Sequence, residues 1–343
     1  MSTALPIRGR VALTGSVAIL LLAGATSCTA SSAAPHRSSD GATASRTAPA
    51  GAAHDPASAS PPHRAASPDP VRAARSVPDG GRVRRVEIPS STTFRPRPAY
   101  LYLPPALATH PGHAFPVLEL LHGTPGQPSD WFTGGRLLAT ANAFAVAHHG
   151  FAPIVVVPDL NGAKRADSEC IRTANGSDVE TYLTRDVVRW VRHRYAREVG
   201  SRPWSVAGLS EGGLCSIMLT LRHPATYSVF GDFSGLMSPQ VEHETAAQSD
   251  QTLFASAADK ARHDPLWLLT HRHYGRLYAW FGVGASDPRP LRAQHALSAA
   301  ARAAHLTVHT ETQPGKHVWR IWAHELQAFL PWSWRYLGPN GAR

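Results

Sequence analysis

Zinc-binding motifs and clustered basic residues are absent from this sequence. The 343 residues include 3 cysteines, and no His-Glu-x-x-His motif or cysteine–histidine group has the spacing of a zinc site. The formal net charge is +10, yet it comes from scattered arginines, without a basic helical stripe or basic–aromatic interleaving. These absences exclude a zinc protein and a nucleic-acid partner from the expected classes. We expect no metal and no organic cofactor.

Long apolar runs are also scarce. The run at residues 11–25 follows two arginines and is short for a membrane span, so residues 1–28 are predicted to be an export signal. The segment Ala25-Thr26-Ser27-Cys28 resembles a bacterial lipobox. Two outcomes stay open: free secretion after cleavage near Ala25, or a membrane tether through a lipid on Cys28. In both, the protein is expected outside the cell or on its surface.

Residues 29–80 contain almost no large apolar side chains and are rich in Ala, Ser and Pro. Such a segment cannot bury enough surface to offset its ordering entropy, so a disordered linker is predicted. Residues 81–338 hold the apolar segments and are long enough for one large core. They are predicted to form a single domain, and the sequence leaves its oligomeric state open.

Apolar strands alternate with amphipathic helices through this domain, which predicts an α/β fold. The expected strands are 83–88, 99–103, 115–121, 154–157, 204–207, 228–233, 276–283 and 306–310. The expected helices are 134–149, 179–197, 214–221, 290–304 and 318–329, and residues 239–275 are expected to be less regular. This alternation predicts a mostly parallel central sheet with helices on both faces.

A glycine-flanked serine lies between a predicted strand and a predicted helix. Gly208-Leu209-Ser210-Glu211-Gly212 fits the G-x-S-x-G pattern of the nucleophile elbow. A serine on such a tight turn leaves no space for side chains two residues before or after it, and its hydroxyl stands clear of the sheet. Ser210 is therefore the predicted nucleophile.

A serine nucleophile needs a base and an acid that orients the base, and on this fold they follow it in the order acid, then histidine. Asp287 follows the strand predicted at 276–283, with Asp232 as the alternative acid. His317 follows the last predicted strand. His324 is its rival, but it lies within a predicted helix and should point away.

Two backbone N–H groups are predicted to form the oxyanion hole. One belongs to Glu211, directly after the nucleophile, and the other to Thr124, directly after His122-Gly123. Two roles are open for the Glu211 side chain: it could repel anionic substrates, or point to solvent at a helix N-terminus, where negative charge is favoured.

Together these segments resemble the esterase D and antigen 85 branch of the α/β-hydrolases, over residues 82–335. That branch includes S-formylglutathione hydrolases, feruloyl esterases, siderophore esterases and mycolyltransferases. The matching segments are Leu121-His122-Gly123, Asp130-Trp131, Val179-Glu180-Thr181-Tyr182-Leu183, Gly208-Leu209-Ser210-Glu211-Gly212-Gly213, Leu221-Arg222-His223-Pro224 and His317-Val318-Trp319. The resemblance implies an α/β-hydrolase fold with Ser210 as nucleophile, Asp287 as acid and His317 as base.

This sequence departs from the branch at Glu211, where members often carry methionine. Trp131 and Trp319 are candidates for lining the substrate site, with core packing as the alternative for each. Cys170 follows the fourth strand and Cys215 lies on the helix after the nucleophile, so neighbouring strands should bring them together. In an exported protein we expect them to form a disulfide.

The sequence therefore predicts a serine esterase that forms an acyl-enzyme on a small-molecule ester or an acyl-lipid. One alternative is an acyltransferase of the mycolyltransferase kind, which passes the acyl group to an alcohol or sugar. Another is a surface protein that keeps the fold and binds without catalysis.

Overall fold

The structure, a computed structural model, describes residues 80–337 apart from residues 93, 164, 165 and 175. The predicted export signal, Cys28 and the linker up to residue 79 lie outside the described residues. The segment in which a single domain is predicted, residues 81–338, is described as far as Leu337.

An eight-stranded sheet with the order β1-β2-β4-β3-β5-β6-β7-β8 organises the described residues. Its strands are β1 (Arg82–Ile88), β2 (Arg97–Leu103), β3 (Val117–Leu121), β4 (Ile154–Pro158), β5 (Trp204–Leu209), β6 (Tyr227–Phe233), β7 (Tyr278–Gly284) and β8 (Thr307–Gln313). β2 pairs antiparallel with β1 and with β4, and the remaining neighbours pair in parallel. This confirms the predicted mostly parallel sheet. Loops that follow β3, β5, β7 and β8 meet at one edge of it.

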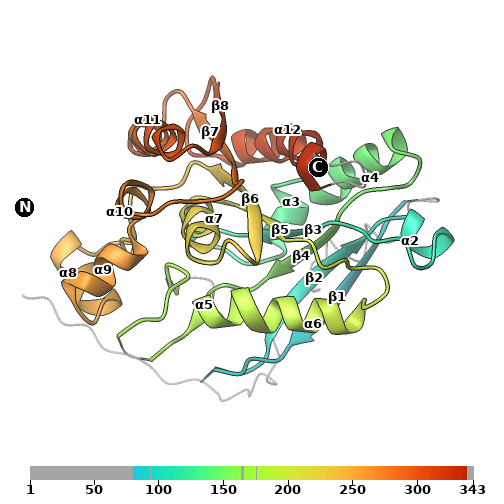
Figure 1. Cartoon of the computed structure of the whole chain (residues 1–343), viewed down its shortest axis with the longest axis horizontal. Coiled ribbons are helices and arrows are strands. Elements are labelled where there is room, and N and C mark those ends of the chain that lie inside the picture. Colours follow the sequence, from blue (N-terminus) through green and yellow to red (C-terminus); the bar gives the residue numbers. More distant parts are fainter. Residues whose placement is uncertain (1–79, 93, 164–165, 175, 338–343) are drawn as a thin grey trace, which may run out of the picture. The chain divides into compact units, whose positions relative to one another are not determined.

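Helices cover both faces of the sheet (Figure 1). α4 (Leu137–Ala147) and α12 (Trp319–Leu337) contact each other along the upper side of the strands in this view. α6 (Val188–Arg194) runs along the lower side. α7 (Glu211–Arg222) and α11 (Pro288–Ala303) share one buried apolar cluster with α6. The short helices α2 (Ala106–Thr109) and α3 (Asp130–Thr133) lie in the loops next to β3.

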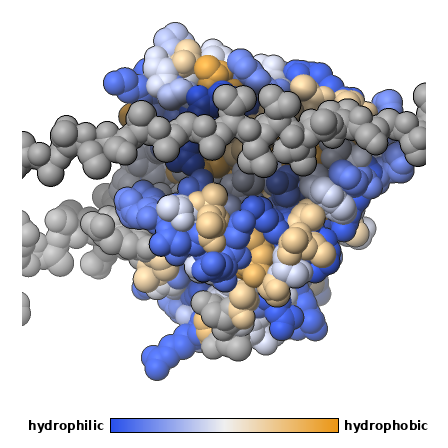
Figure 2. Space-filling view, turned by 90° about the vertical axis from the view of Figure 1, so that its left-hand side faces the viewer, coloured by the Kyte–Doolittle hydropathy of each residue, from blue (hydrophilic) through white to orange (hydrophobic). Residues whose placement is uncertain are grey.

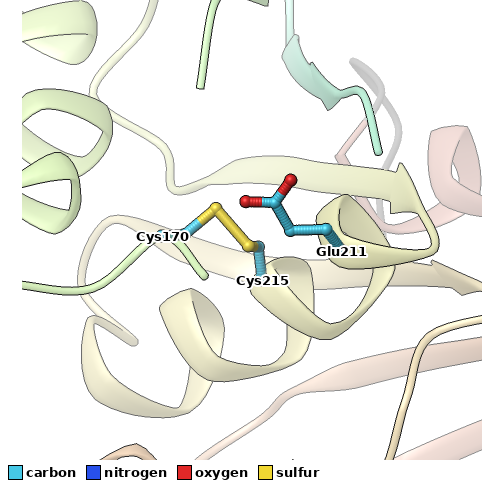
Figure 3. A group of neighbouring side chains, drawn as sticks. All are labelled: Cys170, Glu211 and Cys215. Atoms are coloured by element: carbon cyan, nitrogen blue, oxygen red, sulfur yellow. A yellow bond between two sulfur atoms is a disulfide. The ribbon is translucent and has the colours of Figure 1, made fainter. Parts of the chain in front are cut away.

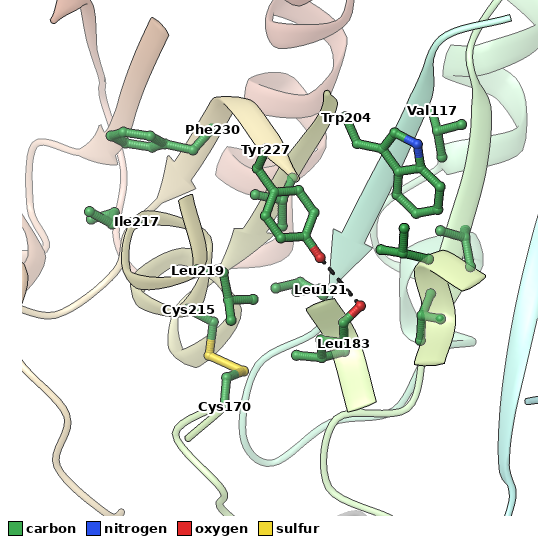
Figure 4. Close-up of a cluster of buried hydrophobic side chains, with 14 of the residues drawn as sticks. Val117, Leu121, Cys170, Leu183, Trp204, Cys215, Ile217, Leu219, Tyr227 and Phe230 are labelled. Atoms are coloured by element: carbon green, nitrogen blue, oxygen red, sulfur yellow. Dashed lines mark hydrogen bonds between the residues drawn. A yellow bond between two sulfur atoms is a disulfide. The ribbon is translucent and has the colours of Figure 1, made fainter. Parts of the chain in front are cut away.

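Alternate side chains of the strands supply two apolar layers. On β4, Val156 packs in the layer under α6 and α7, whereas its neighbour Val155 packs under α4 and α12. Figure 4 shows part of the first layer, where Trp204 and Tyr227 come from β5 and β6. The Tyr227 hydroxyl donates to Glu119 Oε2 on β3 (2.7 Å) and makes a longer contact with the backbone carbonyl of Leu183 (3.4 Å, Figure 4). Because helices cover both faces, the central strands are mostly apolar, with the buried Glu119 on β3 and Asp232 on β6 as exceptions.

The helix predicted over 179–197 is interrupted by a wider turn. The chain forms α5 (Val179–Thr181), the π-helix η2 (Tyr182–Val187) and then α6, which ends at Arg194. Within η2, the buried carboxylate of Asp186 accepts hydrogen bonds from the backbone N–H and the hydroxyl of Ser91, both at 2.7 Å. A π-turn changes the helical period locally, so a search for one continuous period misses it.

Residues 239–275, expected to be less regular, form three short helices. These are α8 (Ala246–Leu253), α9 (Ala257–His263) and α10 (Pro265–His271). Thr245 and Gln248 form a reciprocal capping box at the start of α8. Asp264 caps α10 and Pro265 is its first residue. Local capping thus compensates for the weak apolar periodicity of this segment.

The last helix is longer than predicted. α12 continues past residue 329 to Leu337 and contains the exposed Pro331. Trp332 and Leu337 beyond the proline are buried against the sheet. Their packing compensates for the backbone hydrogen bond that a proline removes.

Figure 2 shows the face at the left of Figure 1, toward α8 and α9, where hydrophilic residues dominate and apolar ones form small separate groups. Within the described ranges the exposed large hydrophobic side chains are those of Val146, Leu266 and Val318. None of the helices described by the structure has the length and apolar character needed to cross a lipid bilayer.

A buried ionic cluster ties two of the matching sequence segments together. Glu180, 7% exposed, accepts from Arg222 Nε (2.6 Å), from His223 Nε2 (2.6 Å) and from His263 Nε2 (3.3 Å). Burial alone would raise the pKa of Glu180. Hydrogen bonds from the two histidines and the Arg222 guanidinium outweigh burial and hold this pKa well below its usual value. The cluster fixes the C-terminal end of α7 against α5 and α9.

Replacing Glu180 with glutamine is expected to lower the free energy of unfolding by about 3 kcal/mol at pH 7, because it leaves a largely buried guanidinium without its counter-ion. A depressed pKa stabilises the fold above the unfolded value near 4.5, and this contribution is lost as the pH falls below it. The difference between the two proteins should therefore shrink below about pH 4.5. Urea titrations from pH 7 to pH 3 measure it. The matched control is Glu87→Gln, at an exposed pair with Arg85 (3.5 Å), which should change stability by less than about 1 kcal/mol.

Candidate active site

Ser210 stands on a sharp turn between β5 and α7. Its φ of 54° and ψ of −117° are unusual for a residue with a side chain. A Cβ atom added at Gly208 would collide with the backbone of Gly212, and one added at Gly212 would collide with the backbone of His122. These close approaches explain why glycine occupies both positions, as the elbow pattern predicted.

The structure brings the other two predicted side chains to this turn. His317 Nε2 lies 3.0 Å from Ser210 Oγ, and His317 Nδ1 lies 2.6 Å from Asp287 Oδ2. The loops after β7 and β8 are joined by backbone bonds, including Ser286 N–H to the Gly315 carbonyl (2.7 Å). Asp287 precedes α11, but its carboxylate caps none of that helix's N–H groups and is therefore free for the imidazole.

The two alternative partners are engaged elsewhere. Asp232 near the end of β6 is buried, and its Oδ1 accepts from the Gly235 N–H (2.6 Å). Burial raises the pKa of Asp232 to about 7. His324 is exposed on α12, and its Nε2 contacts Glu311 Oε1 (3.0 Å). Neither side chain makes a hydrogen bond to Ser210 or His317 among the described contacts.

Ser210, Asp287 and His317 line an open cleft of about 810 Å³. Trp319 and Trp322 form part of its wall, and the Trp322 ring meets the His317 ring edge to face, with centroids 4.8 Å apart. A cleft of this size accommodates a ligand larger than a simple acetate ester.

The prediction that Trp131 lines the substrate site is wrong. Its side chain is fully buried, and its indole N–H donates to the Leu121 carbonyl (3.0 Å). Trp319 does line the cleft, and its ring covers that of Trp131, with centroids 5.5 Å apart. The Trp131 ring points from α3 into the layer under α4 and α12, where its N–H has a partner and its surface is dry.

The two predicted oxyanion donors flank the nucleophile. Glu211 is the first residue of α7, so its N–H has no partner within the helix. Thr124 lies in the loop after β3 and lines the cleft with Ser210. Neither of these N–H groups donates a hydrogen bond to another described residue. Both remain available to a developing negative charge.

The Glu211 side chain does not point to solvent, which rejects one of its two expected roles. Glu211 is buried, 6% exposed. Its Oε2 accepts from the Thr124 hydroxyl and from Asn161 Nδ2 (2.8 Å). Its Oε1 accepts from the N–H groups of Ser168 (3.3 Å) and Glu169 (3.1 Å). Sequence reasoning missed Asn161 and Ser168, because no motif links the loop after β4 to the nucleophile.

Cys170 and Cys215 form a disulfide, as predicted, with Cα atoms 5.7 Å apart. Figure 3 shows the bond next to the Glu211 side chain, with Cys215 one helical turn beyond it on α7. Cys170 directly follows the loop residues that donate to Glu211. The three side chains have potential metal-ligating atoms within 4.8 Å of one another. Because the disulfide uses both sulfurs, they offer no thiolate to a metal ion.

Further carboxyl groups surround this side of the cleft. Burial, and then the charge of Glu211, raise the pKa of Asp167 to about 7. Burial, with the charges of Asp167 and Glu211, raises the pKa of Glu169 well above its usual value. Arg289 also lines the cleft, and its guanidinium donates to Gln240 Oε1 (3.1 Å). The cleft is therefore rich in carboxyl groups, although the whole chain has a net charge of +10.

Comparison with known sequences identifies a protein family that matches this chain. The sequence profile of the putative esterase family matches residues 90–333. An uncharacterised protein from Corynebacterium glutamicum is 30% identical over 250 residues, which are 71% of this chain and 58% of that protein. The chain thus spans less than two thirds of the length of this relative.

Solved structures share the fold. A ferulic acid esterase matches with a TM-score of 0.64 and 19% identity, over 76% of this chain and 100% of that one. An S-formylglutathione hydrolase from Agrobacterium tumefaciens matches with a TM-score of 0.63 and 17% identity, over 77% of this chain and 98% of that one. At these identities the likeness shows the α/β-hydrolase fold, which confirms the fold class predicted from the sequence.

Proposed function

Because the chain belongs to the putative esterase family, we propose that it is a serine ester hydrolase in which Ser210 attacks the carbonyl carbon of the substrate. The observation that carries the proposal is the pair of contacts made by one imidazole, to Ser210 Oγ (3.0 Å) and to Asp287 Oδ2 (2.6 Å). A hydroxyl, an imidazole and a carboxylate in this order supply nucleophile, base and orienting acid.

The proton positions follow from the partners of His317. An ionised carboxylate can only accept, so Asp287 keeps the ring proton on Nδ1. Nε2 then presents its lone pair to the Ser210 hydroxyl and takes its proton as the Oγ–carbon bond forms. Asp287 stabilises the imidazolium that results.

The carbonyl oxygen becomes negative during this attack. The N–H groups of Thr124 and Glu211 are the proposed donors to it. When the tetrahedral intermediate collapses, the alcohol leaves with the proton from His317 Nε2 and the acyl group remains on Ser210. A water molecule, deprotonated by His317, then releases the carboxylic acid and restores the hydroxyl.

A fluorophosphonate probe tests the proposal. It should label the protein on Ser210, as located by peptide mass spectrometry, and it should leave Ser210→Ala unlabelled. Failure to label the unchanged, folded protein would favour a non-catalytic binding protein with the same fold.

Acyl transfer to an alcohol is the second candidate, because a cleft of about 810 Å³ leaves room for an acceptor larger than water. Both reactions share the acyl-enzyme and differ in what attacks it. A series of p-nitrophenyl esters of increasing chain length, with and without a sugar, separates them. Formation of an acylated sugar identifies a transferase, whereas free acid alone identifies a hydrolase.

The carboxyl groups of the cleft predict discrimination against anionic substrates, because like charges repel in a partly dehydrated site. They belong to Asp130, Glu211, Glu242 and Asp287, and those of Asp167 and Glu169 add to the repulsion only as the pH rises above their raised pKa values. We expect kcat/KM for p-nitrophenyl hemisuccinate to be about tenfold lower than for p-nitrophenyl pentanoate, a difference of about 1.4 kcal/mol.

The two esters have similar length and differ mainly in charge. Spontaneous hydrolysis is subtracted with the Ser210→Ala protein as the blank. The ratio should approach one as salt is raised, because added ions screen the repulsion. Equal kcat/KM values at low salt would contradict the prediction.

We also propose that the protein works outside the cytosol. The Cys170–Cys215 disulfide supports this location, because such bonds persist in oxidising compartments. Esterase activity is measured in the culture medium, on intact cells and in the cytosolic fraction. Activity in the medium or on intact cells supports the proposal, whereas activity in the cytosolic fraction alone contradicts it.

A further inference from the structure

The buried carboxylate of Glu211 has no role in the proton transfers above. It belongs to the residue that follows the nucleophile, and it lies among a group of hydrogen-bond donors at the wall of the cleft. All five of its hydrogen bonds come from loops that precede α7 in the sequence. The backbone N–H of the same residue is one of the two proposed oxyanion donors. We therefore expect the buried carboxylate to influence the position of these donors.

Three side chains form a closed triangle beside the nucleophile. Asn161 Nδ2 donates to Thr124 Oγ1 (2.9 Å) and to Glu211 Oε2 (2.8 Å). The Thr124 hydroxyl completes the triangle by donating to Glu211 Oε2. The two corners at Thr124 and Glu211 are the residues whose backbone N–H groups are the proposed oxyanion donors. The triangle thus links the loop after β3 to the start of α7 through side chains.

The other oxygen of the carboxylate fixes the triangle to the loop after β4. Glu211 Oε1 accepts from Ser168 N–H (3.3 Å), Ser168 Oγ (3.4 Å) and Glu169 N–H (3.1 Å). The next residue, Cys170, is bonded to Cys215 on α7. Hydrogen bonds and a covalent bond therefore hold this loop against one side of the nucleophile helix.

We propose that Glu211 is a positioning residue of the oxyanion hole, whose carboxylate holds the Thr124 N–H in register with its own N–H. The inference rests on the proposed function, since it assumes that an oxyanion forms there. Donors to an oxyanion act only at about 2.7–3.1 Å from it, so a small shift of the Thr124 loop weakens transition-state stabilisation. The ground-state ester, whose carbonyl oxygen carries less charge, is affected less.

The chemistry of its partners explains why a carboxylate is needed. Ser168 N–H, Glu169 N–H and Asn161 Nδ2 can only donate, and they approach both oxygens of Glu211. A glutamine side chain would turn its NH₂ group toward at least one of these donors, and a methionine would satisfy none. Ser168 N–H would keep Asn161 Oδ1 (3.1 Å) and Glu169 N–H a longer contact with Asp167 Oδ1 (3.4 Å), but the carboxylate that joins these donors to Thr124 would be lost, which shifts the loops.

Three variants test the proposal with p-nitrophenyl esters. Thr124→Val removes the hydroxyl and keeps both the shape and the N–H, while Thr124→Ser keeps the hydroxyl. Glu211→Gln keeps the shape of the carboxylate and removes its second acceptor. We expect Thr124→Val and Glu211→Gln to lower kcat about 10–100-fold, less than the full loss of one donor. KM should stay within about threefold, and Thr124→Ser should retain most of the kcat.

A trifluoromethyl ketone provides a readout that a purely structural role would not move. It adds to the serine hydroxyl and places an oxyanion in the hole, so its inhibition constant should rise by the same factor as kcat falls. Fluorophosphonate titration of active sites corrects each kcat for the folded fraction. If Glu211→Gln does not fold, Thr124→Val still tests the triangle, because it changes one hydroxyl at the cleft surface.

Each outcome decides the matter. Unchanged kcat and inhibition constant in the folded variants would overturn the proposal, and so would a rise in KM alone, which would mean that these groups bind the ground state. Loss of activity in Thr124→Ser equal to that in Thr124→Val would also overturn it. If the unchanged protein is not labelled by fluorophosphonate, the proposed function itself fails. Labelling with no effect of the variants removes this inference alone.

Discussion

Replacing Ser210 with alanine is expected to lower kcat for a p-nitrophenyl ester about 10⁶-fold. The three side chains act as one unit, so removal of the nucleophile abolishes the acyl-enzyme route and leaves only what the oxyanion donors and binding can supply. KM should change little, because the hydroxyl contributes one contact to substrate binding. Steady-state hydrolysis measures the loss, with fluorophosphonate labelling as a second readout.

Ser234→Ala is the matched control for this experiment. Ser234 follows β6 as Ser210 follows β5, and both have a left-handed backbone, with φ of 61° and 54°. The Ser234 hydroxyl is buried and has no hydrogen-bond partner among the described residues. Its removal should leave kcat within about threefold of the unchanged protein. A comparable loss in both variants would mean that kcat reports on the fold at these strand ends and not on a nucleophile.

Asp287→Asn is expected to lower kcat about 10⁴-fold at pH 7. An amide in place of the carboxylate can donate to His317 Nδ1, which favours the proton on Nε2, the nitrogen that must accept from Ser210. The effect should appear mainly in kcat, because the carboxyl group lies behind the imidazole. Stopped-flow measurement of the acylation step locates the loss.

Asp232→Asn is the control for the loss of kcat in Asp287→Asn. It shows whether replacing any buried carboxyl group near the site has the same effect. Burial already raises the pKa of Asp232 to about 7, so an uncharged side chain there resembles one of its normal states. Its contact with the Gly235 N–H can be kept by the amide oxygen. We expect activity within about threefold of the unchanged protein. If Asp232→Asn matched the loss in Asp287→Asn, the assignment of the acid would be wrong.

Local patterns were enough to predict the parts of the site that lie at strand ends. Gly208 and Gly212 reveal the elbow because the backbone approaches them closely, which is a local requirement. Asp287 and His317 follow strands, and parallel strands bring their carboxyl ends to one edge. Chain order and strand position therefore placed three distant side chains correctly.

Side-chain direction could not be predicted in the same way. Glu211 begins a helix, where exposure to solvent is common, and only the loop after β4 supplies the donors that bury it. Trp131 and Trp319 both lie in segments next to predicted site residues. The Trp131 ring is nevertheless buried in the core, whereas the Trp319 ring lines the cleft. These differences are decided by tertiary packing.

The predicted helix boundaries differ from the observed ones where local preferences and tertiary packing disagree. The π-helix at Tyr182–Val187 departs from the regular period, and the last helix continues past its predicted end at residue 329, through Pro331, because Trp332 and Leu337 pack in the core. The capping residues Thr245 and Asp264 were signals for two of the short helices that the weak periodicity concealed. Reading caps before periodicity would have located them.

The covalent link between Cys170 and Cys215 affects how the protein should be prepared. In the reducing cytosol of a recombinant host, the two cysteines remain reduced. The position of the loop beside Glu211 then depends on hydrogen bonds alone. Kinetic constants from such preparations describe a looser active-site wall, so secretion into an oxidising periplasm or medium is the appropriate production route.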